Sequence, residues 1–182
     1  MYDYIDSHMR YFNKMYGKRL RTYKKTGFSI WTGEAQSKQI INAIYDSGNY
    51  TEKFEQDIVE AEKSVVISSP NIRQDKIDRL LFLVKGRQEK GMNVTVITTD
   101  PEEVVYGSVD ICYELIKDMK AVGIEVITKA EERFAVIDDE LVWHGGMNLL
   151  GKVDVWDDLM RIKNHQVAAE LLEIAMVSTV EL

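Results

Sequence analysis

The sequence has 182 residues but only one cysteine, two prolines and no long run of apolar residues. A single cysteine, Cys112, forms neither an internal disulfide bond nor a thiolate metal cluster, and its setting in VDICYELI indicates a small buried hydrophobic residue. The scarcity of proline excludes a proline-rich linker. No stretch approaches the ~20 apolar residues of a membrane span. Because the N-terminal MYDYIDSHMRYF also lacks the basic and then apolar order of a signal peptide, we expect a cytoplasmic protein with no membrane partner.

Charge is distributed unevenly along the chain. Residues 1–30 contain seven basic and two acidic side chains, whereas the remainder contains 16 basic and 28 acidic ones. Aromatic residues alternate with the N-terminal cations, a mixture that is suited to gripping a nucleic-acid backbone and stacking on its bases, with DNA favoured over RNA. The alternative is a solvated helical face whose aromatic residues pack on the domain. The candidate nucleic-acid-binding residues are Lys18, Arg19, Arg21, Lys24 and Lys25.

A composition shift predicts two regions. Residues 1–50 read as a basic and aromatic appendage with a short helix over 35–45, and residues 51–182 as one domain whose core the 45% hydrophobic content can supply. In the first part of this domain, helical periodicity alternates with short apolar runs. This order predicts an α/β sandwich with a mixed, mainly parallel sheet and helices on both faces.

The last third of the chain departs from this alternation. The runs RFAVID and ELVWHG are strand-like, and the acidic segment that joins them is too short for a crossover, so we predict an antiparallel hairpin. DDLMRI predicts a further strand, and NHQVAAELLEIAMV predicts a final helix.

The hairpin carries a resemblance to a known family. RFAVIDDELVWHGGMNLLG, followed by LMRI, resembles the phospholipase D-like superfamily, most closely its helicase-associated members. The signature of that family is His-x-Lys, four residues, Asp, six residues and Gly-Ser-x-Asn. Here the spacing is kept, but Glu131 stands at the His position, Arg133 at the Lys position, Asp138 at the Asp position, Gly146 at the Ser position and Asn148 at the Asn position.

The resemblance implies a chemistry that this chain has lost. In active members one His attacks phosphorus, a second His from another motif protonates the leaving oxygen, and Lys and Asn hold the phosphate. A chain with one motif obtains the second by forming a homodimer across the motif face. Here such a dimer would bring two copies of Glu131 together, an arrangement that is poor for binding an anion. We therefore expect a degenerate site with no metal and no cofactor, in which Arg133 and Asn148 can still bind a ligand.

Several neighbouring residues are further candidates. His144 is a possible relocated catalytic histidine, although alternation leaves open whether it or Trp143 faces the site. Ser69 and Asn71 follow a strand and are candidate ligand contacts, with a plain turn as the alternative.

Three functions remain open from the sequence. The leading hypothesis is a binding or dimerisation module in, or with, a helicase-like nucleic-acid-processing protein, and we do not expect enzymatic activity by the family mechanism. The alternatives are an active metal-independent phosphodiesterase or nuclease with a non-standard site, and a purely structural dimer scaffold.

Overall fold

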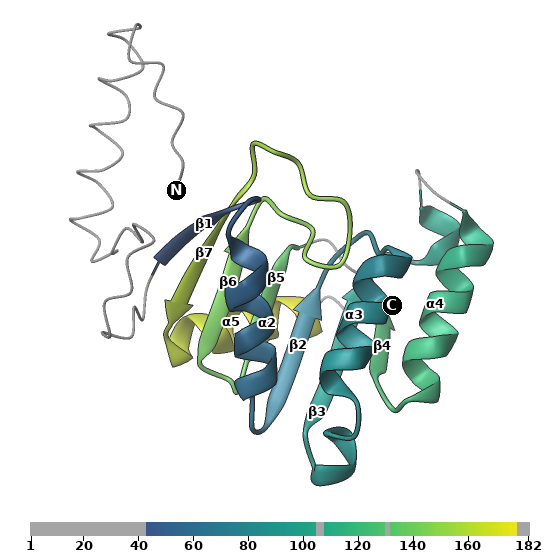
Figure 1. Ribbon diagram of the computed structural model, residues 1–182, viewed down its shortest axis with the longest axis horizontal. Coiled ribbons are helices and arrows are strands. Elements are labelled where there is room, and N and C mark those ends of the chain that lie inside the picture. The colour runs from purple at the N-terminus through teal and green to yellow at the C-terminus, as the bar shows by residue number, and fades with distance from the viewer. Residues whose placement is uncertain (1–42, 105–107, 130–131, 178–182) are drawn as a thin grey trace, which may run out of the picture.

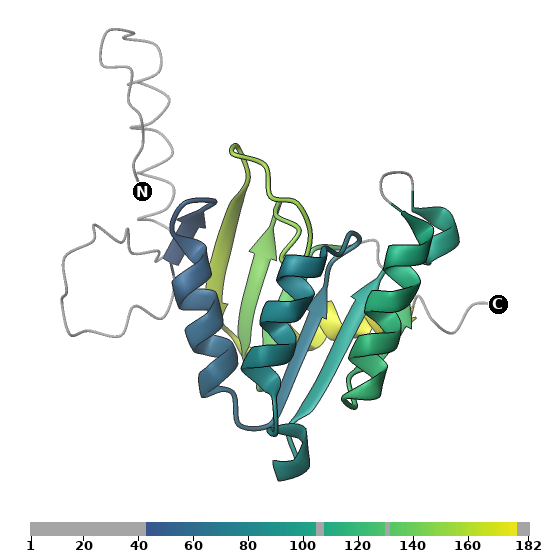
Figure 2. The ribbon, with the colours of Figure 1, turned by 45° about the vertical axis from the view of Figure 1, so that its right-hand side comes forward.

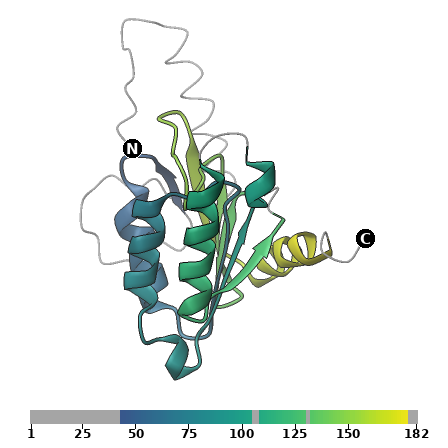
Figure 3. The same ribbon diagram turned by 90° about the vertical axis from the view of Figure 1, so that its right-hand side faces the viewer.

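The computed structural model describes residues 43–104, 108–129 and 132–177. These residues form one sheet that is covered by helices on both faces. Three helices lie side by side on one face of the sheet and a fourth lies on the other (Figures 1 and 3). The helices of the first face are α2 (Tyr50–Glu60), α3 (Gln74–Val84) and α4 (Val109–Ala121), and the helix of the second face is α5 (His165–Val177). Within the described ranges, no helix is long and apolar enough to cross a membrane.

Seven strands form the sheet of the described residues, in the order β1-β7-β6-β5-β2-β3-β4. Their bounds are β1 (Ala43–Asp46), β2 (Ser64–Ser68), β3 (Asn93–Thr98), β4 (Glu125–Thr128), β5 (Phe134–Ile137), β6 (Leu141–Gly145) and β7 (Asp158–Lys163). The predicted hairpin, the further strand and the final helix are confirmed as β5–β6, β7 and α5.

The prediction of a mainly parallel sheet is wrong. In the described part of the chain only the β2–β3 and β3–β4 pairs are parallel, and the other four pairs are antiparallel. Helical crossovers impose parallel pairing on β2, β3 and β4 alone (Figure 2). The other half of the sheet is built from β5, β6 and β7, which follow one another without a helix, and from β1, which pairs antiparallel with β7 at the edge.

Strand β1 corrects the sequence analysis near the predicted boundary at residue 50. Residues 43–45 are not the end of a helix, because they belong to a strand that pairs antiparallel with β7, Ala43 standing opposite Arg161. Tyr45 points inward and packs on Trp143, with ring centroids 4.9 Å apart. The sheet thus begins within the segment predicted as an appendage. The rest of the predicted helix, residues 35–42, lies outside the described residues, and the division into two regions stays a prediction.

The core forms on both faces of the sheet. The larger cluster lies under α2, α3 and α4 and includes the fully buried Trp143 and Leu115, and the smaller one lies under α5 and includes Phe134 and Ala168. Alternation along β6 therefore places Trp143 under α2 and Val142 under α5. Because both faces are covered, the sites open to ligands are at the ends of the strands.

Candidate functional site

Three chain segments meet at one end of the β2–β5–β6 part of the sheet. Antiparallel pairing of β2 with β5 and of β5 with β6 brings the residues that follow β2, precede β5 and follow β6 together. The hydroxyl of Ser68 donates a hydrogen bond to the carbonyl oxygen of Glu132 (2.7 Å), which fixes the start of β5 beside the end of β2. We call the group of Arg133, Gly146 and Asn148 at this place the motif site.

Arg133 joins the two halves of the signature. Its Nη1 donates a hydrogen bond to the carbonyl oxygen of Gly146 (2.5 Å), so that the start of β5 is tied to the end of β6. The side chain is exposed, and it forms no ion pair with any carboxylate of the described residues. Its remaining guanidinium donors are available to a ligand. Glu131, the residue at the nucleophile position, lies outside the described residues.

Asn148 is buried with an unsatisfied oxygen. Its exposed fraction is 7%, and its Oδ1 has no hydrogen-bond partner in the described structure. A buried acceptor of this kind costs free energy unless a donor reaches it. Asn148 is therefore the group of the motif site whose chemistry most clearly calls for a partner.

Ser69 holds the turn after Asn148 in place. Its hydroxyl donates a hydrogen bond to the carbonyl oxygen of Asn71 (2.9 Å) and accepts one from the backbone N–H of Leu150 (3.1 Å). Gly151 packs so closely that a Cβ atom on it would lie 2.6 Å from the carbonyl oxygen of Asn71. Ser69 is fully buried, and the role that the structure shows for it is structural.

Asp138 lies away from the motif site, at the opposite end of β5 from Arg133. Its carboxylate accepts hydrogen bonds from the backbone N–H groups of Glu62, Lys63 and Ser64, at 2.7 to 3.1 Å. Burial raises the pKa of this carboxyl, but the three backbone hydrogen bonds and the charge of Lys63 outweigh it and the pKa is lowered. The aspartate of the signature therefore fastens the turn before β2 to the β5–β6 turn.

His144 lies on the α5 side of the sheet. It pairs with Phe134 across β5, and Phe134 belongs to the core cluster under α5. No hydrogen bond or ion pair joins His144 to another described residue, so nothing in this part of the chain orients its ring. His165 begins α5, where its Nδ1 is 2.7 Å from the carbonyl oxygen of Asp139.

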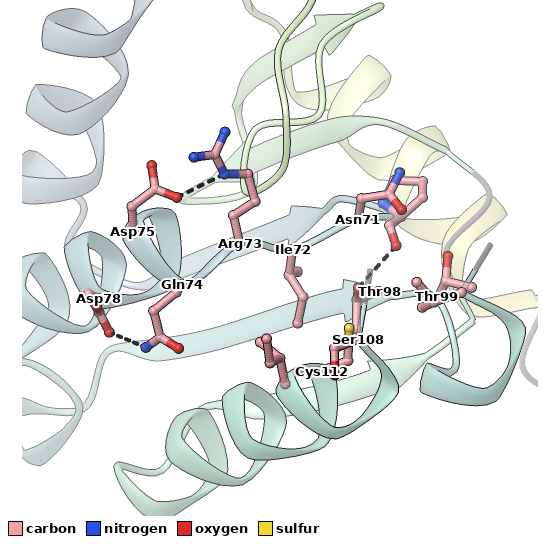
Figure 4. A pocket seen from close by; sticks show the side chains of 13 residues that line it. Asn71, Ile72, Arg73, Gln74, Asp75, Asp78, Thr98, Thr99, Ser108 and Cys112 are labelled. Carbon is pink, nitrogen blue, oxygen red and sulfur yellow. Dashed lines mark hydrogen bonds and ion pairs between the residues drawn. The ribbon is translucent and has the colours of Figure 1, made fainter. Parts of the chain in front are cut away.

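Asn71 lies close to Asn148, because a Cβ atom on Gly151 would be 2.6 Å from the carbonyl oxygen of Asn71 and 3.0 Å from the Cβ atom of Asn148. Asn71 also lines a cavity of about 480 Å³ between the first turns of α3 and α4, at the carboxyl ends of β2 and β3 (Figure 4). Cys112 lines the same cavity and is buried, as predicted. Burial also raises the pKa of its thiol, which disfavours the nucleophilic thiolate.

The charged side chains around this cavity are already engaged. Arg73 Nε donates to Asp75 Oδ1 (3.0 Å), and Gln74 Nε2 donates to Asp78 Oδ1 (2.8 Å) (Figure 4). The assignment of Ser69 and Asn71 as ligand contacts stays a prediction. Groups of three or more potential metal-ligating side chains are absent from the described ranges.

This arrangement of strands and helices is the phospholipase D-like fold. No protein-family model and no curated protein matches the sequence. Among solved structures, the chain is similar to Nuc from Salmonella typhimurium, a phospholipase D family member, with a TM-score of 0.57 and 16% identity over 74% of this chain and 90% of that one. It is also similar to NucT from Helicobacter pylori, with a TM-score of 0.51 and 16% identity over 74% of this chain and 92% of that one.

A third similar structure covers nearly the whole chain. TrmBL2, an archaeal chromatin protein described as showing a novel mode of DNA binding, matches 96% of this chain and 62% of its own length, with a TM-score of 0.54 and 14% identity. The family resemblance seen in the sequence is confirmed at the level of the fold. The five basic residues predicted to bind nucleic acid lie outside the described residues.

Proposed function

We propose that this chain is a catalytically degenerate phospholipase D-like domain that serves as a binding or dimerisation module, in or with a helicase-like nucleic-acid-processing protein. Arg133 and Asn148 keep the positions of phosphate-holding groups, with guanidinium donors available on the first and an unsatisfied buried oxygen on the second. The nucleophile position carries Glu131 instead of histidine. A retained binding scaffold together with a missing imidazole supports binding without turnover.

Glutamate cannot replace histidine in this reaction. A carboxylate repels the phosphodiester that it would have to attack, and two copies meeting across a dimer axis repel one another. His144 offers an imidazole, but it has no orienting partner among the described residues and lies on the α5 side of the sheet. Neither residue supplies the paired acid and base that the family reaction needs.

Nucleic acid is the ligand class that we propose for the module, with DNA before RNA. The basic and aromatic N-terminal residues have the composition of a backbone-gripping segment, whereas the acidic remainder of the chain is unsuited to tight binding of a duplex. The similarity to TrmBL2, a chromatin protein that binds DNA, agrees with this proposal.

The second candidate is a metal-independent phosphodiesterase with a non-standard site. The exposed guanidinium of Arg133 favours it, since this group is able to hold a phosphate beside His144 or Glu131. A third candidate, a dimer scaffold without a ligand, requires neither Arg133 nor the basic residues.

We expect no hydrolysis when the full chain is incubated with single-stranded DNA and with a chromogenic phosphodiester in the presence of a chelator. The reason is the absence of a nucleophilic nitrogen at the motif site. Product would be measured by gel electrophoresis and absorbance, with the variant His144→Ala beside the wild type. Hydrolysis that disappears in His144→Ala establishes the phosphodiesterase candidate instead.

We also expect binding of single-stranded DNA to weaken steeply with salt. If the five N-terminal cations contact phosphates, the slope of log affinity against log salt is roughly −3 to −4. Fluorescence anisotropy would compare the wild type with two variants of equal charge change. One carries glutamine at the five basic N-terminal positions, and the other carries it at exposed lysines of the domain: Lys85, Lys90, Lys117, Lys120 and Lys152.

The two variants separate the candidates. Loss of the slope in the N-terminal variant alone supports the proposed module, because a general charge effect would appear in both. Salt-insensitive or undetectable binding by the wild type contradicts the nucleic-acid proposal and favours the dimer scaffold.

A further inference from the structure

The space beside Gly146 is filled by the side chain of Asp157. Gly146 stands where the family signature has serine. A Cβ atom on Gly146 would lie 2.7 Å from Asp157 Oδ1 and 3.1 Å from Asp157 Cγ, which is closer than Cβ atoms ordinarily approach such neighbours. A side chain at position 146 and Asp157 in its present position therefore exclude one another.

The loop between β6 and β7 presents this carboxylate to the motif site. Val155 and Trp156 are 78% and 94% exposed, whereas Asp157 beside them is half-buried. Backbone hydrogen bonds from Asp157 to Asp154 (3.2 Å) and from Gly146 to Asp158 (3.1 Å) hold the loop against the end of β6. The Asp157 carboxylate forms no hydrogen bond or ion pair with any described residue.

Asp157 and Arg133 both contact Gly146. Arg133 Nη1 donates to the carbonyl oxygen of Gly146 (2.5 Å), and Asp157 Oδ1 lies beside its α-carbon. Ordinary bond lengths then place the carboxylate within roughly 10 Å of the guanidinium. That separation is about one Debye length at physiological salt, so an anion on Arg133 experiences the charge of Asp157.

We propose that Asp157 shifts the ligand specificity of the motif site by disfavouring phosphate groups on Arg133. Its carboxylate fills the space of the family's serine hydroxyl, a hydrogen-bond donor, with an acceptor of negative charge. The site therefore favours neutral or hydrogen-bond-donating groups over phosphate, and such groups also suit the unsatisfied oxygen of Asn148. This inference rests on the proposed function, in which the basic N-terminal residues contact the phosphates of the nucleic acid and the motif site binds another group without catalysing.

The substitution Asp157→Asn tests the proposal, because it removes the charge and keeps the shape. We expect the full-length variant to bind inorganic phosphate roughly two- to threefold more tightly than the wild type at low ionic strength, because a charge about 10 Å away beside an exposed guanidinium is partly screened by water. Affinity would be measured by NMR titration at fixed ionic strength. Asp154→Asn is the matched control, since it removes an exposed charge from the same loop, and it should leave phosphate affinity unchanged.

A second substitution locates the phosphate. The increase in phosphate affinity caused by Asp157→Asn should disappear in the double variant Asp157→Asn/Arg133→Gln, because Arg133 is the proposed anion contact. A gain that persists without Arg133, or an equal gain in Asp154→Asn, overturns the proposal by assigning the effect to the overall charge. Equal affinities of Asp157→Asn and the wild type overturn it as well.

The close contact between position 146 and the Asp157 side chain can be tested without any ligand. Gly146→Ala should lower the melting temperature of the wild type, and it should do so less in an Asp157→Ala background, where the clash is absent. Equal losses in the two backgrounds overturn the contact itself. Hydrolysis of a phosphodiester by the wild type would instead contradict the proposed function, so the two failures are distinguishable.

Discussion

Replacing Asp57 by alanine is expected to lower the free energy of unfolding by about 3–5 kcal/mol, because it breaks a buried ion pair. The side chain of Asp57 is 1% exposed and that of Arg161 is 10% exposed. Arg161 contacts both carboxylate oxygens of Asp57, at 2.6 and 2.9 Å, and the indole N–H of Trp143 donates to one of them at 2.9 Å. Alanine removes the carboxylate that links α2 to β6 and β7 by hydrogen bonds, and it leaves the donors of Arg161 and Trp143 without this acceptor.

Denaturant unfolding of the wild type and Asp57→Ala would measure this loss. Asp75→Ala is the matched control, since Asp75 also pairs with an arginine, Arg73, but both side chains are more than half exposed. The control should change the free energy of unfolding by less than about 1 kcal/mol. A similarly small change in Asp57→Ala would show that the buried pair does not hold α2 on the sheet.

Replacing Asp138 by asparagine is expected to lower the free energy of unfolding by about 2 kcal/mol near neutral pH, because hydrogen bonds to a charged acceptor are replaced by weaker ones. Three backbone N–H groups point at this carboxylate, and asparagine offers them one oxygen and an NH₂ group. The backbone itself tolerates the change. Asp138 has a φ of +52°, a left-handed conformation that asparagine adopts readily.

The effect of Asp138 should depend on pH in one direction. Its pKa is lower in the folded state than in the unfolded state, despite burial, because of the three backbone hydrogen bonds. The contribution of the Asp138 carboxylate to the free energy of unfolding is therefore fully present above the unfolded pKa of about 3.9. It is lost as pH falls through the lower pKa of the folded state. Unfolding curves of the wild type and Asp138→Asn should differ at pH 6 and converge in acid.

Asp139→Asn is the control for this experiment. Asp139 lies in the same turn with a φ of +60°, but its carboxylate receives only a long hydrogen bond from Ser64 (3.4 Å). A loss of stability in Asp139→Asn equal to that of Asp138→Asn would point to the turn, and not to the three amides, as the cause.

Two of the contacts described above hold the fold together without involving a ligand. Asp138 fastens two turns far from the motif site, and Gly151 permits a close approach to Asn71. Both contacts lie within the fold itself. Since neither contact involves position 131, both are compatible with the binding module that we propose.

The sequence by itself determined the elements from Thr51 onward, the hairpin, and the absence of histidine and lysine at positions 131 and 133. Periodicity reports which residues of one segment are buried, and this is local information. The tertiary structure alone decided that β1 pairs with β7, that Trp143 faces α2 while His144 lies on the α5 side, and that Asp157 fills the space beside Gly146.

The physical reason is that these contacts join segments distant in the chain or depend on the path of a loop. The Asp57 carboxylate meets Arg161, 104 residues away, and Asp138 meets Lys63 across 75 residues. Which segments meet depends on strand register and on the energy of the whole packed core, and no pattern within a single segment records it.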